Sequence, residues 1–342
     1  MLIEFQTNLK SSKAKAGRKP MRTESSCVRI SGGLGNQLFQ YAFSRVIMIE
    51  TQSPVQLDIE RYSLENARKC EIANLFPEAL FSNSMRIFAM GIFSKILPNR
   101  IKHKLLAQRE GRIRKCESFM GRKVVLEKIT PYDASIPLQV ENYYVGNFIS
   151  PEYWHRNQKR LLEEIDRAIS FSACSAGTLL PSENTIAVHI RRGDYLENKK
   201  TRDFHGYCKD SYYIEAVESL RAIHQSLDTV LISSDDEDCA RYFSSKIQAV
   251  GFQVSILENL DPTSTLYVLS RAHYFVGSNS TFSWWGAYLG NQKLSVFPRN
   301  WFMDEKIDIN PDHFFPISPI LITDALTSEP NIDYKVTGMV ER

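Results

Sequence analysis

Apolar and polar residues alternate along this chain in blocks that predict strands followed by helices. Residues 28–30 form a short run typical of a buried strand, a glycine-rich turn comes next, and apolar side chains recur on one helical face over residues 36–50. Residues 55–57 then predict a second strand, which ends at Asp58. A strand, a tight turn, a helix and a strand in this order form the first unit of a parallel α/β domain.

The same alternation resumes in the second half of the chain. An amphipathic helix is predicted over residues 151–169, and the small, polar residues 170–184 after it form the expected interdomain linker. Asp261 and Pro262 have the residue types of a helix N-cap and of the first helical position. Beyond the linker we expect strands over residues 185–190, 229–233, 253–257 and 274–277, and helices over residues 211–224, 236–250 and 281–289 besides the one that Pro262 begins.

The length of 342 residues, at about 150 residues per domain, predicts two such domains. We place the first over residues 27–170 and the second over residues 184–300. Residues 1–26 are expected to be a disordered basic tail. Residues 301–342 become irregular and are expected to pack back on the first domain.

Composition excludes several classes of protein. Apolar residues at 43% and charged residues at 24% are globular values, which exclude wholesale disorder. The 42 Lys and Arg against 39 Asp and Glu leave a net charge of +3, so the chain as a whole is not a general polyanion binder, and we expect no nucleic-acid partner. The longest apolar stretch, residues 87–93, is shorter than the roughly 18 to 20 residues of a membrane-spanning helix.

The N-terminal residues and the cysteines indicate a cytoplasmic protein. Residues 1–22 are polar and basic, with neither the apolar core nor the cleavage site of a secretory signal. The six cysteines lie far apart without any C-x-x-C pair, which argues against both a zinc site and a disulfide framework. We therefore expect the chain to work in a reducing cytoplasm.

One stretch departs from the balanced charge of the chain. Residues 95–123 contain ten Lys or Arg against only Glu110 and Glu117, and they follow the apolar residues 87–93. A solvated helical face is the ordinary interpretation of such a stretch. The alternative is contact with an anionic membrane surface, which would place the protein peripherally at the inner membrane. Nucleic-acid binding is disfavoured because only Phe119 supplies an aromatic ring.

The segment with the richest chemistry follows the first strand of the second domain and reads His189-Ile190-Arg191-Arg192-Gly193-Asp194-Tyr195. Ligands of open α/β sheets bind at the carboxyl ends of the strands. His189 and Arg191 share one face of the strand, and Gly193 allows a sharp turn that brings Asp194 to the same crevice. Guanidinium groups beside a carboxylate suit a site that holds a pyrophosphate and manages a proton, whereas an Arg–Asp ion pair that only fixes a turn is the alternative.

A second candidate segment, residues 276–286, predicts a strand, a polar loop and the start of a helix. The free amides and the positive dipole end of a helix N-terminus bind anions. The hydroxyl groups of Ser280, Thr281 and Ser283 add further donors. Ordinary N-capping, with both tryptophans of this segment in the core, is the alternative.

The third candidate is the glycine-rich turn after the first strand, Gly32-Gly33-Leu34-Gly35-Asn36-Gln37. It contains G-x-G before a helix, with Asp58 about 20 residues further on, which is most of a dinucleotide-binding fingerprint. Leu38 stands where the last glycine of that fingerprint belongs. Asn36 and Gln37 place two amides at the helix start, where they suit hydrogen bonds to a polyol.

A weaker candidate is Asp236-Glu237-Asp238, which follows another predicted strand. Neighbouring carboxylates could hold Mg²⁺ or Mn²⁺ on a nucleotide sugar. We prefer helix capping, because acidic residues in the first helical turn are favoured by the dipole.

Together these segments resemble the α-1,2-fucosyltransferases of glycosyltransferase family 11. The resemblance covers residues 28–301 and rests on residues 32–42, 189–195 and 279–285, which occur in the expected order and spacing. It implies a GT-B-like α/β fold of two Rossmann-type domains that face a central cleft. At residues 146–150 the chain departs from the aromatic residues and glutamine of many bacterial relatives, which bears on acceptor preference.

The resemblance also implies an activity. It is the inverting transfer of L-fucose from GDP-β-L-fucose to the 2-hydroxyl of a galactose-type residue, without a metal or other cofactor. The expected acceptor is a β-galactoside or oligosaccharide, free or lipid-linked, in bacterial O-antigen or capsule synthesis. The first domain would then be the acceptor side, and the second would bind the donor.

The same resemblance assigns roles to residues. Arg191 is the expected catalytic cation, because the departing diphosphate gains negative charge; His189 assists it, and Asp194 is the candidate proton acceptor. We assign donor binding to Arg191, Arg192, Asp235, Asn279, Ser280, Thr281, Ser283 and Trp284, and contact with the acceptor or the donor sugar to Gly33, Gly35, Asn36 and Gln37.

Two other enzyme classes are weighed against this assignment. A metal-dependent nucleotide-sugar transferase of another specificity would use Asp236 and Asp238, and sensitivity to a chelator would reveal it. An NAD-dependent oxidoreductase would rest on Gly33, Gly35 and Asp58. The oxidoreductase hypothesis would give no role to the two arginines of the second domain, Arg191 and Arg192.

Overall fold

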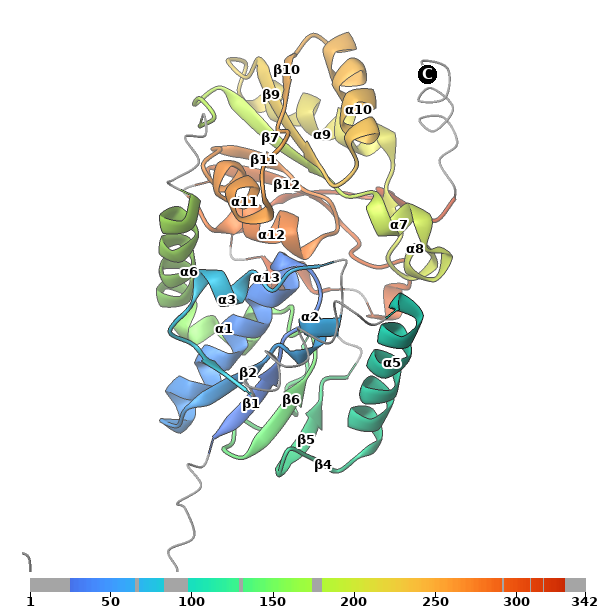
Figure 1. Ribbon diagram of the computed structural model, residues 1–342. Coiled ribbons are helices and arrows are strands. Elements are labelled where there is room, and N and C mark those ends of the chain that lie inside the picture. Colours follow the sequence, from blue (N-terminus) through green and yellow to red (C-terminus); the bar gives the residue numbers. More distant parts are fainter. Residues whose placement is uncertain are drawn as a thin grey trace, which may run out of the picture.

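The computed structural model describes residues 25–64, 68–82, 98–128, 132–173, 180–290, 292–307, 309–315 and 317–329. Within these ranges the chain forms two large sheets, one in each half of the molecule (Figure 1). Most of the predicted N-terminal tail, the apolar residues 87–93 and residues 174–179 of the predicted linker lie outside the described residues.

The first sheet, called sheet A, has six strands in the order β3-β2-β1-β6-β5-β4. All neighbouring strands are parallel except β4 and β5. The strand order reverses between β1 and β6, which makes the carboxyl ends of these two strands the switch point of the sheet. The bounds are β1 Ser26–Arg29, β2 Val55–Asp58, β3 Leu80–Phe81, β4 Ser118–Phe119, β5 Arg122–Leu126 and β6 Asn142–Val145.

Both faces of sheet A are covered because successive residues of a strand point to opposite faces. Val28 of β1 packs into the core on the side of α1 (Leu34–Thr51). Its neighbour Cys27 packs on the other side against Ile113 of α5 (Asn99–Lys115). The remaining helical segments of this half are α2 Glu60–Leu64, α3 Ile72–Leu75, η1 Pro151–Tyr153, η2 His155–Asn157 and α6 Gln158–Ala173.

The second sheet, called sheet B, has six parallel strands in the order β10-β9-β7-β11-β12-β13. In chain order this is the 3-2-1-4-5-6 arrangement of a Rossmann domain. The strands are β7 Thr185–Ile190, β9 Thr229–Ser234, β10 Gln253–Ile256, β11 Tyr274–Val276, β12 Leu294–Pro298 and β13 Ile320–Ile322, and β8 Tyr207–Cys208 pairs separately with β14 Leu326–Thr327. The helical segments are α7 Gly193–Glu197, α8 Lys199–His205, α9 Asp210–Ile223, α10 Glu237–Ala249, α11 Pro262–Ser270, α12 Thr281–Tyr288, η4 Glu305–Ile307 and α13 Pro311–Phe314.

These sheets confirm the predicted α/β class with two Rossmann-type units facing a shared cleft, the GT-B-like arrangement. The predicted elements of the second half all form, with boundaries shifted by three residues or fewer except at residues 151–169. There, two short 3₁₀ segments, η1 and η2, precede the α-helix.

The segment after residue 300 differs from the expectation. It was expected to be irregular and to pack back on the first domain. Part of it does contact the first half, since α13 packs against η1. However, β13 pairs with β12 and extends sheet B, because its apolar residues pair with the edge of β12 that would otherwise be open.

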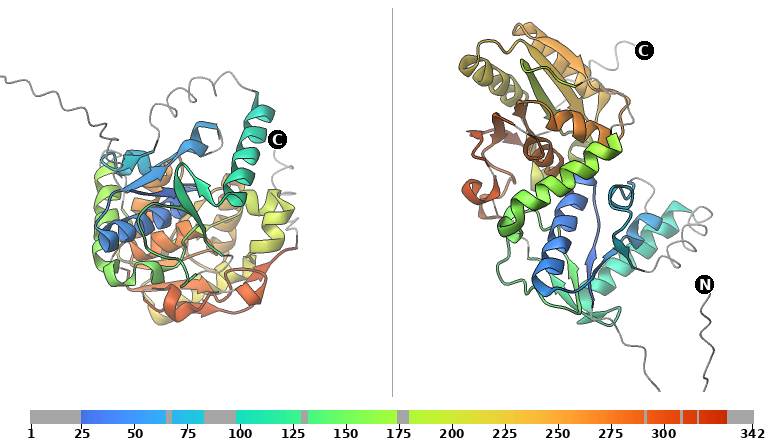
Figure 2. Two further views of the ribbon diagram at one scale, coloured as in Figure 1. Left: turned by 90° about the horizontal axis from the view of Figure 1, so that it is seen from below. Right: turned by 90° about the vertical axis from the view of Figure 1, so that its left-hand side faces the viewer.

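One apolar cluster joins the two halves of the molecule. Phe39 of α1 packs against both Trp284 and Trp285 of α12, with ring centroids 4.8 and 4.9 Å away. Trp154, between η1 and η2, stacks on Trp285 at 5.9 Å. All four rings are fully buried. The two sheets therefore share a core, which fixes the shape of the cleft between them. The right-hand view of Figure 2 shows α6, in light green, running between the two halves.

Among the described residues, no helix has both the length and the apolar character that crossing a membrane requires.

Candidate active site

A cavity of about 1040 Å³ lies where the switch points of the two sheets face each other. In sheet B the strand order reverses between β7 and β11, and Arg191 and Asn279, which follow these strands, line the cavity. From sheet A the cavity is lined by Ser31 after β1 and Gly146 after β6. Because open parallel sheets bind their ligands at such switch points, this cavity is the candidate active site.

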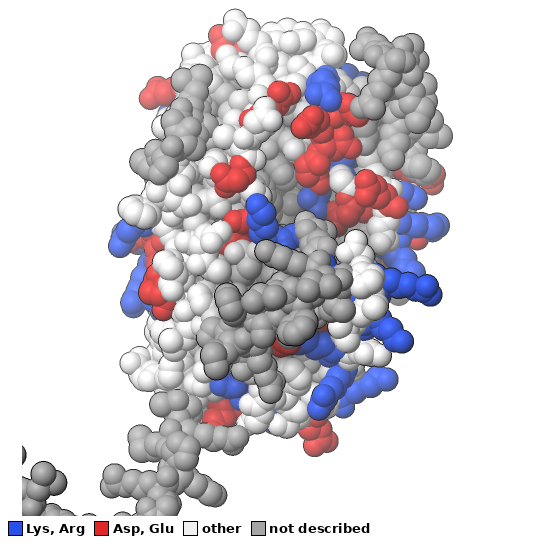
Figure 3. Space-filling view, in the orientation of Figure 1, with Lys and Arg blue, Asp and Glu red and all other residues white. Residues whose placement is uncertain are grey.

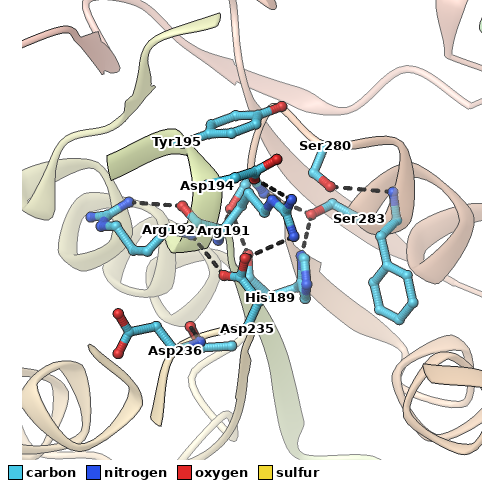
Figure 4. Close-up of polar contacts among 12 residues, drawn as sticks. His189, Arg191, Arg192, Asp194, Tyr195, Asp235, Asp236, Ser280 and Ser283 are labelled. Atoms are coloured by element: carbon cyan, nitrogen blue, oxygen red, sulfur yellow. Dashed lines mark hydrogen bonds and ion pairs between the residues drawn. The ribbon is translucent and has the colours of Figure 1, made fainter. Parts of the chain in front are cut away.

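Arg191 faces this cavity from the end of β7. Its Nη2 atom pairs with Asp194 at 2.5 Å and its Nη1 atom with Asp235 at 2.7 Å (Figure 4). Burial lowers the pKa of Arg191, but Asp235 and Asp194 raise it by more than burial lowers it. The net shift is upward, so the guanidinium stays cationic. The two ion pairs occupy part of the five-donor guanidinium fork and leave its other N–H groups available to a ligand.

The two carboxylates hold Arg191 from different sides. Burial raises the pKa of Asp235, an effect that the charge of Arg191 only partly offsets. A Cβ atom at Gly193 would lie 2.3 Å from a carboxylate oxygen of Asp235 and would push that carboxylate away from its place beside Arg191. Asp194 is 40% exposed and also pairs, at 3.0 Å, with Arg68 from the first half of the chain.

His189 lines the cavity as a neutral donor. The main-chain N–H of Ser278 donates to Ser283 Oγ at 3.0 Å, and Ser283 Oγ lies 2.6 Å from His189 Nδ1. Because Ser283 Oγ accepts the N–H of Ser278, its own hydrogen has to be donated to another group, and His189 Nδ1 is the acceptor in contact with it. Nδ1 therefore carries no hydrogen, and the hydrogen of the neutral ring is on Nε2. Burial, together with the charge of Arg191, lowers the pKa of His189 to about 3. The ring is therefore uncharged at neutral pH.

Two helix N-termini meet at the cavity. Thr281 Oγ1 of α12 donates to the side-chain oxygen of Asn36 in α1 at 2.7 Å, and both residues line the cavity. Gly35 permits this approach, because a Cβ atom there would lie 2.5 Å from the main-chain nitrogen of Phe282. Gly33, the N-cap of α1, makes no side-chain cap and faces open space. The N–H groups and dipoles of both helices can therefore act on an anion in the cavity.

The segments that build this cavity also carry a family match. The family model described as glycosyl transferase family 11 matches residues 26–316, which include the carboxyl ends of β1, β6, β7 and β11. The chain belongs to glycosyltransferase family 11. It is therefore a glycosyltransferase, and the cleft between its two sheets is the candidate site of that reaction.

Several curated proteins are similar to this family 11 chain. Alpha-1,2-colitosyltransferase of Escherichia coli is 28% identical over 286 residues, covering 82% of this chain and 93% of that protein. O-antigen biosynthesis glycosyltransferase WbnK of Escherichia coli is 24% identical over 298 residues, covering 80% and 93%. Galactoside alpha-(1,2)-fucosyltransferase 1 of Homo sapiens is 28% identical over 143 residues, covering 37% and 39%.

Solved structures resemble the chain more distantly. POFUT1 in complex with GDP-fucose is 11% identical with a TM-score of 0.41, covering 82% of this chain and 98% of that chain. NodZ alpha-1,6-fucosyltransferase soaked with GDP-fucose is 11% identical with a TM-score of 0.42, covering 79% and 93%. Identities and TM-scores this low carry no argument about ligand or reaction.

Arg192 of the family 11 segment does not reach the cavity, contrary to its predicted role in donor binding. Its side chain is fully buried and extends away from Arg191 (Figure 4). The guanidinium lies over the rings of Tyr207, Tyr213 and Phe243 at 4.7, 5.5 and 5.3 Å. Adjacent strand residues point to opposite faces, so a residue that follows a cavity-facing Arg191 points into the core of sheet B.

Three other predicted contacts also lie outside the cavity lining. Ser283 and Trp284 are fully buried: the first orients His189, and the second donates through Nε1 to the main-chain oxygen of Phe314 at 3.0 Å. Gln37 is fully buried as well, and its amide binds main-chain groups of residues 32 and 69–72. These side chains position the site and do not line it.

The remaining predicted residues do line the cavity, and two of them, Asn279 and Ser280, also make contacts that hold the surrounding structure. Ser280 caps α12 by accepting the N–H of Phe282 at 3.3 Å. The Asn279 amide donates to the main-chain oxygens of His205 and Trp301 at 2.8 and 3.2 Å, which ties α8 to this loop. The cavity lining thus includes His189, Arg191, Asp194, Asp235, Asn279, Ser280, Thr281, Gly33, Gly35 and Asn36.

Glu127 is a cavity-lining residue that sequence reasoning missed. It follows β5 and accepts the main-chain N–H groups of Asn147 and Phe148 at 2.7 and 2.9 Å, and the Tyr153 hydroxyl at 2.9 Å. Burial raises the pKa of Glu127 to about 7 in spite of these donors. A strand of only five residues without strict alternation gave no signal that its carboxyl end would reach the site.

A buried polar network beside sheet A was missed too. Arg29 at the end of β1 pairs with Glu110 of α5, and both residues line the cavity. Arg109 of α5 pairs with Asp58 and Glu60. The residues of each ion pair are far apart in the sequence, so local sequence patterns could not predict that they are in contact.

Asp236 caps α10, as preferred from the sequence, by accepting the N–H of Cys239 at 3.0 Å. Asp238 pairs with Arg241 at 2.8 Å. Among the described residues, no group of three or more His, Cys, Asp or Glu side chains is arranged to hold a metal ion.

Proposed function

We propose that this family 11 glycosyltransferase transfers L-fucose from GDP-β-L-fucose, with inversion, to the 2-hydroxyl of a galactose-type residue of a glycan. The observation that carries the proposal is Arg191, held by two carboxylates in a cavity where the N-termini of α1 and α12 meet. The names of the relatives, which include α-1,2 transferases of colitose and fucose, support the sugar class and the linkage. The O-antigen relative supports a place in surface-polysaccharide synthesis.

The donor diphosphate would bind between Arg191 and the two helix N-termini. As the bond from the anomeric carbon to the diphosphate breaks, the sugar becomes oxocarbenium-like and negative charge builds on the departing GDP. A fixed guanidinium and fixed N–H groups stabilise that charge without reorganising during the reaction. The Nε2–H group assigned to His189 would add a neutral donor on the same side.

The acceptor would enter from the side of sheet A. Gly33 leaves open space there, and Asn36 offers an amide to a sugar hydroxyl. With the diphosphate leaving toward sheet B, the acceptor 2-hydroxyl attacks the opposite face of the anomeric carbon. That geometry gives inversion, so a β-linked donor yields an α-linked product.

Asp194 is the carboxylate that we propose receives the acceptor proton, because it lines the cavity and pairs with Arg68 of the first half of the chain, the side from which the acceptor enters. A proton on the Asp194 carboxylate would weaken its ion pairs with Arg191 and Arg68. The acceptor proton and the two guanidinium groups therefore compete for the same carboxylate. Asp194→Asn keeps the size of the side chain and removes the base. Full turnover by this variant, with unchanged donor KM, would remove Asp194 from the mechanism.

The proposed reaction needs no metal ion, because Arg191 and the helix N-termini supply the positive charge. The competing hypothesis is a metal-dependent transfer of another sugar. The capping bond of Asp236 and the ion pair of Asp238 give both carboxylates structural roles.

The decisive experiment incubates the purified protein with GDP-fucose and a panel of β-galactosides, both water-soluble and lipid-linked, with and without EDTA. NMR of the product locates the new bond. We expect an α-linked fucose on the 2-hydroxyl and a rate that EDTA leaves unchanged. Loss of activity in EDTA, restored by Mg²⁺ or Mn²⁺, would establish the metal-dependent alternative.

A parallel arm replaces the donor with GDP-colitose. Colitose lacks the 3-hydroxyl of L-fucose, so comparing kcat/KM for the two donors isolates the contribution of that hydroxyl. We expect higher kcat/KM with GDP-fucose. Transfer from GDP-colitose alone would refute the assigned sugar while leaving the linkage to be read from the same NMR spectrum.

A further inference from the structure

The helix α5 concentrates positive charge in a chain that is otherwise slightly acidic. Its 17 residues contain seven Lys or Arg and one Glu, a net charge of +6, whereas the whole chain carries +3. The rest of the chain therefore sums to −3. Figure 3 shows Lys and Arg gathered over this helix, with Asp and Glu more prominent over the other half of the molecule.

The cations of α5 divide between an inner and an outer side. On the inner side Arg109 is neutralised by Asp58 and Glu60, and Leu106 and Ile113 are buried. Five exposed cations form no ion pair with another of the described residues. Arg100, Lys104, Arg112 and Lys115 lie on the outer side, and Arg114 also lines the cavity. Ion pairing among the described residues thus leaves the charge of the outer side uncompensated.

Two large apolar side chains accompany these cations. Ile101 is 44% exposed and Leu105 is 40% exposed, and a spacing of four residues places them on one face, one turn apart. In the helical projection Arg112 lies between these two side chains, and Lys104 lies beside the same face. A helix that exposes cations beside large apolar residues has the composition of an interfacial helix, which inserts its apolar side chains among lipid tails while its cations contact anionic headgroups.

The position of α5 connects this surface to the active site. Figures 1 and 2 show α5 along the outer edge of the molecule, beside sheet A. Glu110 and Arg114 of the same helix line the cavity. A surface that binds α5 would therefore lie next to the opening through which an acceptor reaches the site.

We propose that the outer face of α5 docks this enzyme on an anionic lipid surface. Each Lys or Arg near such a surface favours binding by about fivefold, so several uncompensated cations together give reversible attachment. A lipid surface fits better than a nucleic acid, because the exposed face offers aliphatic side chains to insert and no Phe, Tyr or Trp ring on which a base could stack. The proposal does not depend on which sugar the enzyme transfers.

The test is sedimentation of the full chain with vesicles of phosphatidylcholine alone or with 30% phosphatidylglycerol. We expect binding to the anionic vesicles only, and its loss at high salt. A variant with Arg100→Gln, Lys104→Gln, Arg112→Gln and Lys115→Gln should bind at least tenfold more weakly. The matched control replaces four exposed cations elsewhere, Arg156→Gln, Lys159→Gln, Arg160→Gln and Lys293→Gln, and should bind like the wild type.

A second variant, Ile101→Ser with Leu105→Ser, separates insertion from charge. It should also release the protein from anionic vesicles, while transfer to a water-soluble acceptor stays unchanged in all variants. The proposal is refuted if the wild type ignores anionic vesicles or if the α5 and control variants lose binding equally. Equal affinity for short duplex DNA, with no effect of the serine changes, would assign the face to a polyanion instead. Since vesicle binding is measured without donor or acceptor, failure here is distinct from failure of the proposed transfer reaction.

Discussion

At the scale of single residues, the shape of the cation at position 191 is the most direct test of the site. Arg191 spans two carboxylates and still presents N–H groups to the cavity, which an ammonium group cannot do. We expect Arg191→Lys to lower kcat by about 10² to 10³, the usual loss for one preorganised donor. Steady-state kinetics with GDP-fucose check this, and turnover near the wild-type value would count against the assignment.

The neighbouring arginine supplies the matched control. Arg192→Lys conserves charge in the same way, but it acts on a side chain buried among aromatic rings that also pairs with Asp210 at 3.3 Å. We expect this variant to melt at a lower temperature because it loses the planar cation–π contacts. Its folded fraction should keep the wild-type KM for the donor. A selective loss of kcat at unchanged Tm would instead place Arg192 in the reaction.

Glu127 should make stability depend on pH in a defined direction. Its pKa is about 7 in the folded protein, against an ordinary value of 4.5. A carboxyl group whose folded pKa is raised stabilises the fold at low pH and loses that contribution as the pH rises through 7. Glu127→Gln stays uncharged throughout. The difference in Tm, variant minus wild type, should therefore grow between pH 5 and pH 8.

Differential scanning fluorimetry of both proteins across that range measures this difference. The depressed pKa of His189 gives the opposite slope, since its stabilising contribution is lost as the pH falls below about 6.5. It is present in both proteins, so it cancels in the comparison. A difference in Tm that stays flat from pH 5 to pH 8 would show that Glu127 does not titrate there.

The direction of a side chain was predictable where a local rule applied. It was not predictable where a residue distant in the sequence determines the contact. The two-residue period of a strand placed His189 and Arg191 on one face, and the same rule, applied strictly, would have removed Arg192 from the site. No local rule could show that the Gln37 amide binds the chain near residue 70. Nor could one show that Ser283 orients His189.

At the scale of elements, the contact between α1 and α12 depends on one glycine. A Cβ atom at Gly35 would lie 2.5 to 2.6 Å from the main chain of residues 281 and 282, and backbone at that distance cannot yield. We expect Gly35→Ala to push the two helices apart, with a substantial fall in Tm and loss of activity. Thermal denaturation and kinetics measure both.

Gly33→Ala is the matched control, two positions away in the same turn. A Cβ atom there meets nothing within 4 Å, and its backbone angles suit any residue. The fold should therefore keep its Tm, while the added methyl group enters the cavity and raises KM for a substrate. Equal destabilisation by the two changes would contradict the close approach assigned to Gly35.

Elements were predicted best where several signals coincided. The helix α11 was predicted from Asp261 as its N-cap and Pro262 at its first position, and both appear in the structure. Between residues 59 and 141 the strands have two to five residues, too few for a periodic pattern to emerge. Their place in sheet A comes from the pairing of β3 with β2, of β5 with β6 and of β4 with β5, which the local sequence does not reveal.

At the scale of the whole molecule, the two Rossmann-type halves are joined by a core that they share, in addition to a core confined to the second half. Two domains of ordinary size would each bury their own apolar residues. Here one cluster takes in Val28 and Phe39 from the first half together with Trp284 and Phe314 from the second. The cleft is therefore set by packed rings, and the site residues of both halves are held by the same core that stabilises the fold.

This shared core predicts that the protein unfolds as a single cooperative unit. Heat capacity, tryptophan fluorescence and far-ultraviolet circular dichroism should report one coincident transition, because Trp154 and Trp285 lie in the cluster that joins the halves. Phe39→Ala removes the ring that packs against both tryptophans of α12, and the change should cost about 3 to 5 kcal/mol. With the contact between the halves weakened, the transitions reported by the three methods should separate. The control Ile247→Ala lies in the core confined to the second half. It should lower Tm, and the three methods should still report one transition. Two well-separated transitions in the wild type would mean that the halves fold independently and that the ring cluster does not couple them.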